Sequence, residues 1–164
     1  MSAQVNKREL LELIIQSLSD DLQVLIDASI AAKAAATDSE AKPENQYDTR
    51  GLEQSYLAAG QARRANQLKE SIEALKSFSL QDPKSSAVVD LSSLVTVTSE
   101  DDEENIYFIV PQRGGVKVNY QGQEISTLTP DSILGEKLLE KTVGDNFDLN
   151  IKGRVRGYAI SKLH

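Results

Sequence analysis

Residues 11–36 read LELIIQSLSDDLQVLIDASIAAKAAA, and this stretch decides how the first half of the chain folds. Apolar or small residues recur along it at alternating spacings of four and three, which is the heptad stripe typical of a coiled coil. The stretch contains no glycine or proline, and it ends in alanine, the residue with the highest helix propensity. The stripe consists of Leu11, Ile15, Leu18, Leu22, Leu25, Ser29, Ala32 and Ala36. We therefore expect one long helix from about Val5 to Ala36.

A second helical pattern covers residues 58–79. Its stripe consists of Ala58, Gln61, Ala65, Leu68, Ile72, Leu75 and Ser79. In both stripes the small residues lie near the segment that connects the two patterns, and the large residues lie far from it. Two antiparallel helices would thus pack on leucine and isoleucine at one end and approach closely on alanine at the other. Because the sequence shows no third apolar helix, we expect an isolated hairpin with arms about 45 Å long at ~1.5 Å per residue.

The connecting segment DSEAKPENQYD, residues 38–48, is rich in acids for a turn between helices. Its four carboxylates belong to Asp38, Glu40, Glu44 and Asp48. We expect the second helix to begin at Pro43, because proline is well tolerated in the first helical position and Glu44 would then lie at the positive end of the helix dipole. The alternative begins the helix after Asp48 or Thr49 as N-cap and leaves a longer loop.

The period of the sequence changes after the polar stretch QDPKSS, residues 81–86, whose proline a continuing helix would not tolerate. Short runs of β-branched and aromatic residues then alternate with turn signals. The expected strands cover residues 88–91, 94–98, 106–110, 116–120, 147–151 and 157–160, with a short helix at 134–139. We therefore predict an α+β protein: a coiled-coil hairpin over residues 1–80, a linker over 81–86 and a small antiparallel β domain with one helix over 87–164.

A second acidic run, EDDEEN at residues 100–105, falls between two expected strands. The spacing of a calcium-binding EF-hand, with its central glycine, is absent from it. We interpret the run as a solvated hairpin turn.

Composition excludes several classes of function. Without cysteine the chain has no disulfide or zinc–thiolate chemistry, and we expect a cytoplasmic location. Its one histidine, His164, argues against Ser-His or Cys-His catalysis. A net charge of −7 argues against independent binding to duplex DNA. Neither a signal-peptide pattern nor an apolar run of the roughly 18–20 residues that span a bilayer is visible, so we expect no membrane association.

Several short motifs follow one another along nearly the whole chain. They are Glu44-Asn45 with Tyr47, IYFIV at residues 106–110, Ile125-Ser126, SILGEKLL at residues 132–139 and KTVGD at residues 141–145. Their order and spacing resemble those of the Gre family of bacterial transcript-cleavage factors. The family counterparts are Ser-Glu-Asn-Ala-Glu-Tyr, Tyr-x-Ile-Val, Ile-Ser, Ser-Pro-Leu-Gly-x-Ala-Leu-Leu and Lys-Lys-Val-Gly-Asp. The resemblance implies an FKBP-like fold for the β domain.

The resemblance also implies an accessory factor that is not an enzyme in its own right. A Gre factor docks its C-terminal domain at the rim of the RNA polymerase secondary channel, on the beta-prime side, and its coiled coil reaches the polymerase active site. There, two acids at the tip help to hold a magnesium ion shared with the polymerase and a water that attacks the backtracked RNA 3′ end. Carboxylates suit this role because hard cations prefer oxygen ligands. Glu44 is the tip acid by this resemblance, with Asn45 and Tyr47 beside it.

The sequence departs from the family pattern at the first tip acid. Ala41 stands where the family has aspartate, three residues before Glu44, and Pro43 replaces a serine. The candidate companions of Glu44 are therefore Glu40, as a second magnesium ligand, and Asp48. No cofactor of the protein's own is implied.

On the docking domain, the resemblance assigns partner contacts to Ser132, Ile133, Leu134 and Gly135. Ile133 stands where the family has proline, and Glu140 stands where it has glycine. These differences fall in the expected docking domain, so the family pattern does not define its partner surface.

Alternative functions follow from the same features. A regulator could occupy the secondary channel without stimulating cleavage, since one tip acid alone binds magnesium poorly. An FKBP-like domain could be a prolyl isomerase, but such pockets are built from aromatic residues, and this chain has five tyrosines, three phenylalanines and no tryptophan. The heptads could also serve a coiled-coil adaptor or dimer. The similar lengths of the two helical arms favour a hairpin within one chain, and so a monomer.

Overall fold

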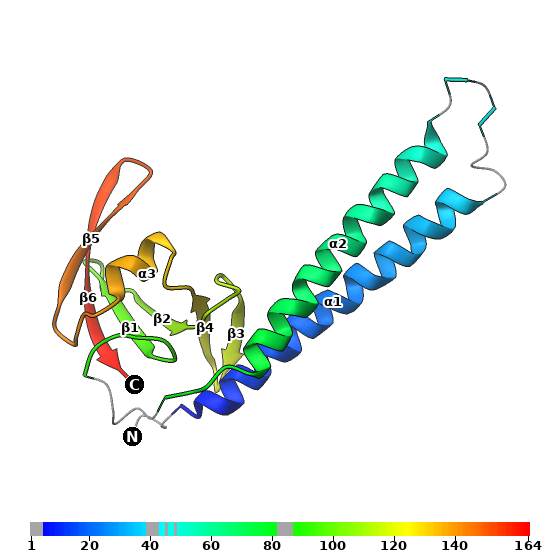
Figure 1. Ribbon diagram of the computed structural model, residues 1–164. Helices are drawn as coiled ribbons and strands as arrows, with labels where there is room; N and C mark the ends of the chain where they lie inside the picture. Colours follow the sequence, from blue (N-terminus) through cyan, green and yellow to red (C-terminus); the bar gives the residue numbers. More distant parts are fainter. Residues whose placement is uncertain (1–4, 39–42, 45, 48, 82–86) are drawn as a thin grey trace. The chain divides into compact units, whose positions relative to one another are not determined.

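The computed structural model describes residues 5–38, 43–44, 46–47, 49–81 and 87–164. Two long helices come first and a six-stranded sheet with one short helix follows (Figure 1). The helices are α1 (Lys7–Thr37), α2 (Arg50–Lys76) and α3 (Ile133–Leu138). The strands are β1 (Leu94–Ser99), β2 (Glu104–Ile109), β3 (Lys117–Tyr120), β4 (Gln123–Leu128), β5 (Asn146–Ile151) and β6 (Arg154–Leu163). The predicted α+β class is confirmed.

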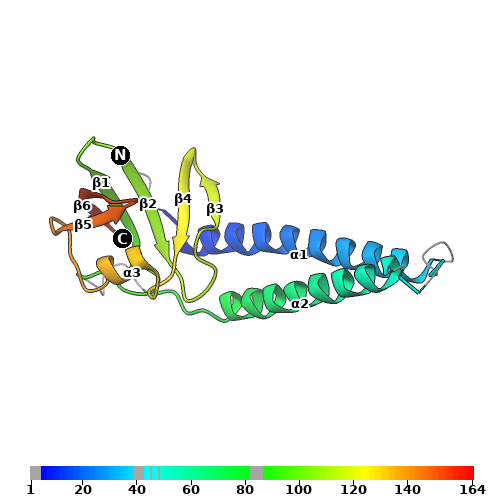
Figure 2. The same ribbon diagram turned by 90° about the horizontal axis from the view of Figure 1, so that it is seen from above.

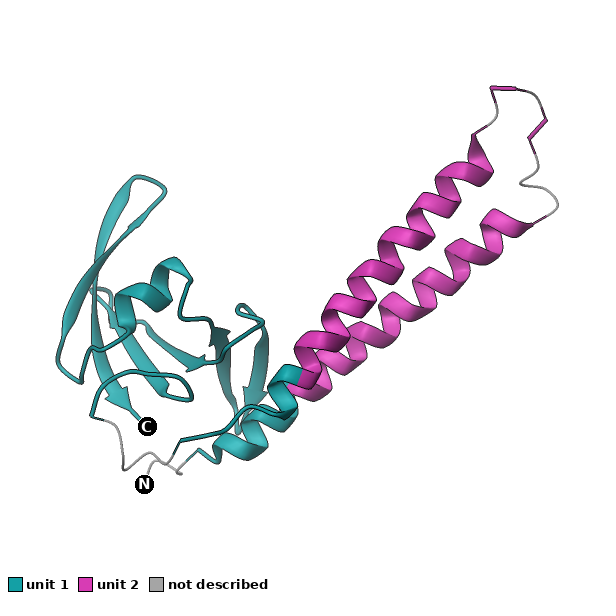
Figure 3. Cartoon of the chain, viewed as in Figure 1, with its two compact units in different colours: residues 1–14, 74–164 teal, residues 15–73 magenta. Residues whose placement is uncertain are grey.

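The chain packs as two compact units (Figure 3). Residues 15–73 form one unit, which holds most of α1 and α2. Residues 1–14 and 74–164 form the other, so the first turns of α1 and the end of α2 pack with the sheet. None of the helices in the described ranges combines the length and the apolar character needed to cross a membrane. The expected linker at residues 81–86 lies, apart from Gln81, outside the described residues.

In the helical unit, α1 and α2 lie side by side as an antiparallel hairpin (Figures 1 and 2). The predicted stripes are the buried ones, with Leu18, Ala32, Ala65, Leu68 and Ile72 all less than a tenth exposed. Where the stripes contain small residues, the side-chain hydroxyl of Ser29 donates a hydrogen bond to the backbone carbonyl of Ala58 at 3.4 Å. The heptad interpretation is confirmed, except that Ser79 lies beyond the end of α2.

The predicted start of the second helix at Pro43 is wrong, since α2 begins at Arg50. The carbonyl of Thr49 accepts the first helical hydrogen bond from the amide of Glu53 at 2.9 Å. The Thr49 hydroxyl also donates to the Glu53 carboxylate at 2.8 Å. This start leaves Gly51 in the first turn, whereas a start at Pro43 would place it in the helix interior at a cost of about 1 kcal/mol.

The sheet has the strand order β3-β4-β2-β1-β6-β5. Its neighbouring strands are antiparallel, as predicted, except for β2 and β4, which run parallel. The reason is a tight hairpin between β3 and β4, where Gln121 and Gly122 have positive φ angles of 52° and 83°. This hairpin returns the chain so that β4, and not β3, lies next to β2.

One expected strand, residues 88–91, is absent from the sheet that the structure describes. Val89 is nevertheless buried, and its backbone bonds to the segment after α3. Its amide donates to the carbonyl of Lys141 at 2.7 Å, and its carbonyl accepts from the amide of Glu140 at 2.9 Å. The apolar run at residues 88–91 therefore contributes the buried side chain of Val89 to the core but does not form a strand of the sheet.

The sheet buries side chains on both of its faces. On one face, residues of β1, β2, β5 and β6 pack with Leu138 of α3 around a cluster that includes Val95, Val97 and Ile160. On the other face, the cross-strand partners Leu94 and Phe108 are also buried. Full burial of Leu10, Ile14 and Leu75 shows that the helix ends assigned to this unit share its core.

Polar contacts fix the start of α1 within this unit. The side-chain oxygen of Asn6 accepts hydrogen bonds from the amides of Arg8 at 3.1 Å and Glu9 at 3.4 Å, which caps the helix. The hydroxyl of Tyr120, at the end of β3, donates to the Glu9 carboxylate at 2.9 Å and accepts from the Asn6 amide at 3.3 Å. The bond to Glu9 raises the pKa of Tyr120 above its ordinary value.

Candidate functional site

The connection between α1 and α2 contains the candidate tip residues. Glu44 and Tyr47 are both exposed, as the sequence predicts for a tip, and the Tyr47 side chain is 82% exposed. Glu40, Asn45 and Asp48 lie outside the described residues, as does Ala41. The contacts at the tip are therefore described here for Glu44, Tyr47 and the start of α2.

Glu44 forms an ion pair with Arg50, the first residue of α2. Its Oε1 atom lies 3.5 Å from Nη2 of Arg50, and the two side chains are 78% and 59% exposed. An ion pair between side chains this exposed is worth about 1 kcal/mol or less. The Glu44 carboxylate therefore stays accessible to a cation that carries a higher charge than arginine.

Sequence reasoning missed Arg50 as a site residue. The signal that could have found it is the position of the arginine in the first turn of a helix, where the helix dipole disfavours positive charge. A cation in that place does not stabilise the helix, so it points to a local partner such as Glu44.

The tip can be tested for its fit to magnesium. This ion is often bound by one or two carboxylates while it keeps several waters. Glu44 fits as one such ligand because its carboxylate is exposed. Within the described ranges, no three His, Cys, Asp or Glu side chains gather closely enough to hold a metal ion.

Exposed apolar side chains near the tip are a second feature of this region. Leu52, Tyr56 and Leu57 of α2 are 56%, 70% and 49% exposed. Leu52, Tyr56 and Ala59 recur at the i, i+4 and i+7 positions of a helix face, outside the buried stripe, and this repeat is the signal that was missed.

The predicted docking motif lies at the start of α3, where two of its four residues have structural roles. The Ser132 hydroxyl accepts a hydrogen bond from the Gly135 amide at 3.0 Å and donates to the Thr129 carbonyl at 2.7 Å. A Cβ atom on Gly135 would lie 2.0 Å from the Thr129 carbonyl oxygen, so a larger residue does not fit. Ser132 and Gly135 therefore fix the backbone conformation at the start of α3.

The other two residues of the motif point in different directions. Leu134 packs against the core cluster beside the fully buried Leu138. Ile133 is 80% exposed. Of the four predicted docking residues, Ile133 is thus the one whose side chain is largely exposed to solvent.

Comparison with known proteins finds similarity at the level of structure only. No family model matches the sequence, and no curated protein matches it significantly.

Three solved structures illustrate the similarity. Gfh1 from Thermus aquaticus aligns with 93% of this chain and 92% of its own, at 18% identity and a TM-score of 0.40. GreA factor homolog 1 (Gfh1) of Thermus thermophilus aligns with 92% of this chain and 94% of its own, at 18% identity and a TM-score of 0.37. The prokaryotic transcription elongation factor GreA/GreB from Nitrosomonas europaea aligns with 58% of this chain and 78% of its own, at 22% identity and a TM-score of 0.38. Because none of these TM-scores reaches 0.5, we infer the function from the residues of this chain.

Proposed function

We propose that the protein is a Gre-type transcription elongation factor that enters the secondary channel of bacterial RNA polymerase and stimulates cleavage of backtracked RNA. The observation that carries the proposal is Glu44, an exposed acid in the connection between two long antiparallel helices. The motifs that resemble the Gre family support it, because Glu44 is the residue that they place at the tip. The factor would act in the cytoplasm, as a monomer, on the polymerase's own reaction.

The hairpin and its acid match what this reaction requires. The 31 residues of α1 extend about 46 Å at ~1.5 Å per residue, enough for a tip to reach a buried active site. Glu44 would supply one carboxylate oxygen to a magnesium ion whose other ligands belong to the polymerase. The ion, when bound, would stabilise charge that develops on the attacking or leaving oxygen.

A second candidate function is occupancy of the channel without cleavage. The ion pair between Glu44 and Arg50 favours it, because a positive charge 3.5 Å from the carboxylate opposes cation binding. Ala41 favours it too, since it stands where the resemblance requires a second acid. A factor of this kind would regulate transcription by blocking the channel.

One experiment separates the two candidates. The protein is added to a backtracked elongation complex of bacterial core polymerase with 5′-labelled RNA, and shortening of the RNA is followed at several magnesium concentrations. We expect cleavage at least about tenfold faster than with polymerase alone, and loss of this gain in Glu44→Ala, since placing a metal ion is worth several kcal/mol. Glu70→Ala, which removes an exposed acid elsewhere on α2, should retain full stimulation.

Binding is measured on the same complexes, by displacement of a fluorescently labelled copy of the protein. Binding without cleavage at any magnesium concentration would establish the regulator and reject the cleavage factor. Failure to bind core polymerase would reject both.

The docking assignment has its own test. Ile133→Asp should weaken binding to the polymerase by about tenfold, because it places a charge in an interface that an exposed isoleucine would fill. Val143→Asp makes the same change at a side chain that is 50% exposed and lies outside the motif. Equal effects of the two substitutions would contradict the assignment.

A further inference from the structure

The β5–β6 hairpin carries a surface that the proposed function does not use. β1 ends at Ser99, whose cross-strand partner on β6 is Tyr158. β6 begins at Arg154 and pairs with β5 along residues 154–159. In the sheet as described, residues 154–157 therefore have a neighbouring strand on one side only. We call residues 154–157 the free edge of β6.

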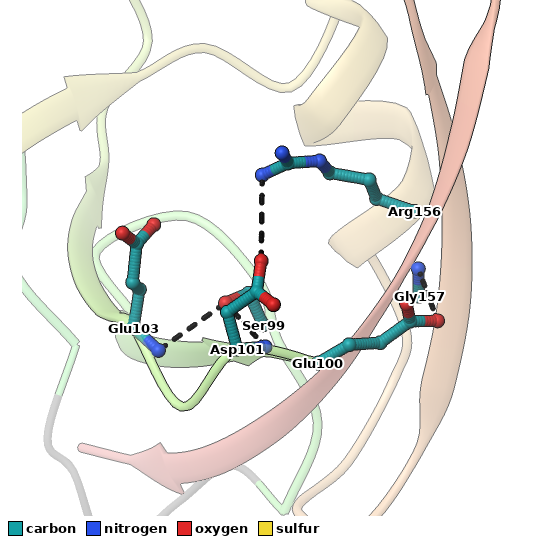
Figure 4. Close-up of polar contacts among 6 residues, drawn as sticks. All are labelled: Ser99, Glu100, Asp101, Glu103, Arg156 and Gly157. Carbon is teal, nitrogen blue, oxygen red and sulfur yellow. Dashed lines mark hydrogen bonds and ion pairs between the residues drawn. The ribbon is translucent and has the colours of Figure 1, made fainter.

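The acidic turn between β1 and β2 covers the lower end of this free edge (Figure 4). Oε1 of Glu100 accepts a hydrogen bond from the Gly157 amide at 2.9 Å. Oδ2 of Asp101 lies 3.8 Å from Nη1 of Arg156. The Ser99 hydroxyl holds the turn by accepting from the amides of Asp101 at 3.3 Å and Glu103 at 3.2 Å. Two carboxylates thus stand where a further strand would lie.

Glycine at position 157 is part of this arrangement. A Cβ atom there would lie 2.5 Å from Oε1 of Glu100, so glycine allows the carboxylate to reach the backbone. The two contacts show how a carboxylate can bind at the free edge. It can accept a hydrogen bond from a backbone amide of the strand, or it can pair with an arginine side chain.

The upper part of the free edge is open. Residues two apart along a strand direct their amides to the same side, so the Val155 amide points the same way as that of Gly157. No carboxylate among the described residues lies within ion-pair distance of Lys152 or Arg154. The aliphatic side chains of Val155 and Ile151 are 65% and 45% exposed. Cationic and aliphatic groups therefore gather here on a chain of net charge −7.

We propose that the free edge of β6 binds an extended acidic segment of another protein, in which carboxylates alternate with aliphatic side chains. Added beside the open part of this edge, such a segment would place a carboxylate next to Arg154, which shares one face of the sheet with Arg156. Its aliphatic side chains would lie next to Val155 on the opposite face. Asp101, beside Arg156, is the intramolecular example of the first contact.

A nucleic acid fits this surface less well. Single strands bind on aromatic side chains that stack with the bases, and on grooves lined with cations. The exposed apolar groups here are aliphatic, so they offer no aromatic face on which a base could stack. The geometry thus favours a protein segment, independently of the proposed role in transcription.

The test uses the full-length protein and a short fluorescent peptide of alternating glutamate and valine. Fluorescence anisotropy should show saturable binding that weakens as the salt concentration rises, because exposed ion pairs are screened. The corresponding lysine–valine peptide and a short single-stranded RNA should not bind. No binding of the acidic peptide, or equal binding of either control, would overturn the proposal.

Substitution then locates the site. Arg154→Glu should raise the Kd for the acidic peptide at least about tenfold, since it turns an attractive charge into a repulsive one. Lys69→Glu makes the same charge change at an exposed position of α2 and should leave the Kd within about twofold. Circular dichroism verifies that both variants are folded.

A measurement on the unchanged protein completes the test. Titration with the peptide should shift the amide resonances of residues 151–157 more than those elsewhere in the chain. Shifts centred elsewhere, or a Kd unchanged by Arg154→Glu, would contradict the assignment.

Discussion

The tip of the helical hairpin and the start of α3 both carry motifs that resemble one family, yet the two regions use their residues differently. At the tip, Glu44 is 78% exposed, with Arg50 at 3.5 Å as its ion-pair partner. At the start of α3, Ser132 makes two hydrogen bonds and Gly135 lies against a backbone carbonyl. The difference is that the tip exposes the side chain of Glu44, while two residues of the α3 motif, Ser132 and Gly135, fix the local backbone.

This contrast separates effects on stability from effects on activity. Substitutions at the start of α3 should lower the free energy of unfolding, because buried contacts are lost. Substitutions at the tip should leave it unchanged. Four measurements test the contrast, beginning with the largest expected effect.

Gly135→Ala should be the most damaging single change. Its Cβ atom would meet the Thr129 carbonyl oxygen at 2.0 Å, which forces the backbone apart. We expect the free energy of unfolding to fall by about 4 kcal/mol or more, measured by urea denaturation.

Gly60→Ala is the matched control for that change. No atom lies within 4 Å of the added methyl group in α2, so the higher helix propensity of alanine should stabilise the protein by about 0.5–1 kcal/mol. Equal losses at the two glycines would break the contrast between the regions.

Leu138→Ala should have the next largest effect. Leu138 is fully buried in the core cluster, so we expect a loss of about 3 kcal/mol in the free energy of unfolding. Ile133→Ala, five residues earlier, removes a side chain that is 80% exposed and should change stability by about 0.5 kcal/mol or less. A large loss at Ile133 would show that it packs within the protein and does not face a partner.

Tyr120 should give a smaller effect that depends on pH. The pKa of Tyr120 is raised by its hydrogen bond to Glu9 and by burial, so folding favours its neutral form. The stability that this bond contributes is present below the ordinary tyrosine pKa of 10.0 and is lost as the pH rises through the higher value of the folded state. Thermal melts should therefore show a difference between wild type and Tyr120→Phe at neutral pH that shrinks in strongly alkaline buffer.

Tyr56→Phe is the control for this measurement, since Tyr56 is 70% exposed. It should melt like the wild type at each pH. A difference between wild type and Tyr120→Phe that stays constant across the alkaline range would contradict the coupling to Glu9.

Glu44→Gln should have the smallest effect on stability. It removes one exposed ion pair, so the free energy of unfolding should change by about 1 kcal/mol or less in calorimetry. The same variant should lose the cleavage stimulation that we propose. A destabilised Glu44→Gln protein would mean that the tip also shapes the fold.

The hairpin was predictable from the sequence because the four–three spacing states directly which helix face is buried. The start of α2 was not, since a proline and a threonine both offer plausible first turns. The propensity of Gly51 and the bonds of Thr49 decide between them. Strand β4, QEISTL, is largely polar and escaped detection beyond Ile125-Ser126. The parallel pairing of β2 with β4 depends on the tight β3–β4 hairpin. A prediction that treats each strand by itself does not show which strands become neighbours.

The candidate site was predictable in part for a similar reason. The family resemblance placed Glu44 and Tyr47 at the tip, and both side chains are exposed in the connection between α1 and α2. The partnership of Glu44 with Arg50 is a contact in space that no spacing rule describes. The sequence pattern identified the residues of the predicted docking motif, but it did not indicate which of their side chains would be exposed. Ser132 and Gly135 serve the turn, and Ile133 faces solvent.

Along the hairpin, the buried stripe changes from leucine and isoleucine to alanine and serine. Burial of alanine releases much less free energy than burial of leucine, so the alanine-rich end should open locally at a lower cost. Backbone amides at residues 29–36 and 51–58 should then exchange with deuterium sooner than those at residues 65–72. A hairpin built in this way should therefore open from its alanine-rich end while its leucine-rich end stays closed.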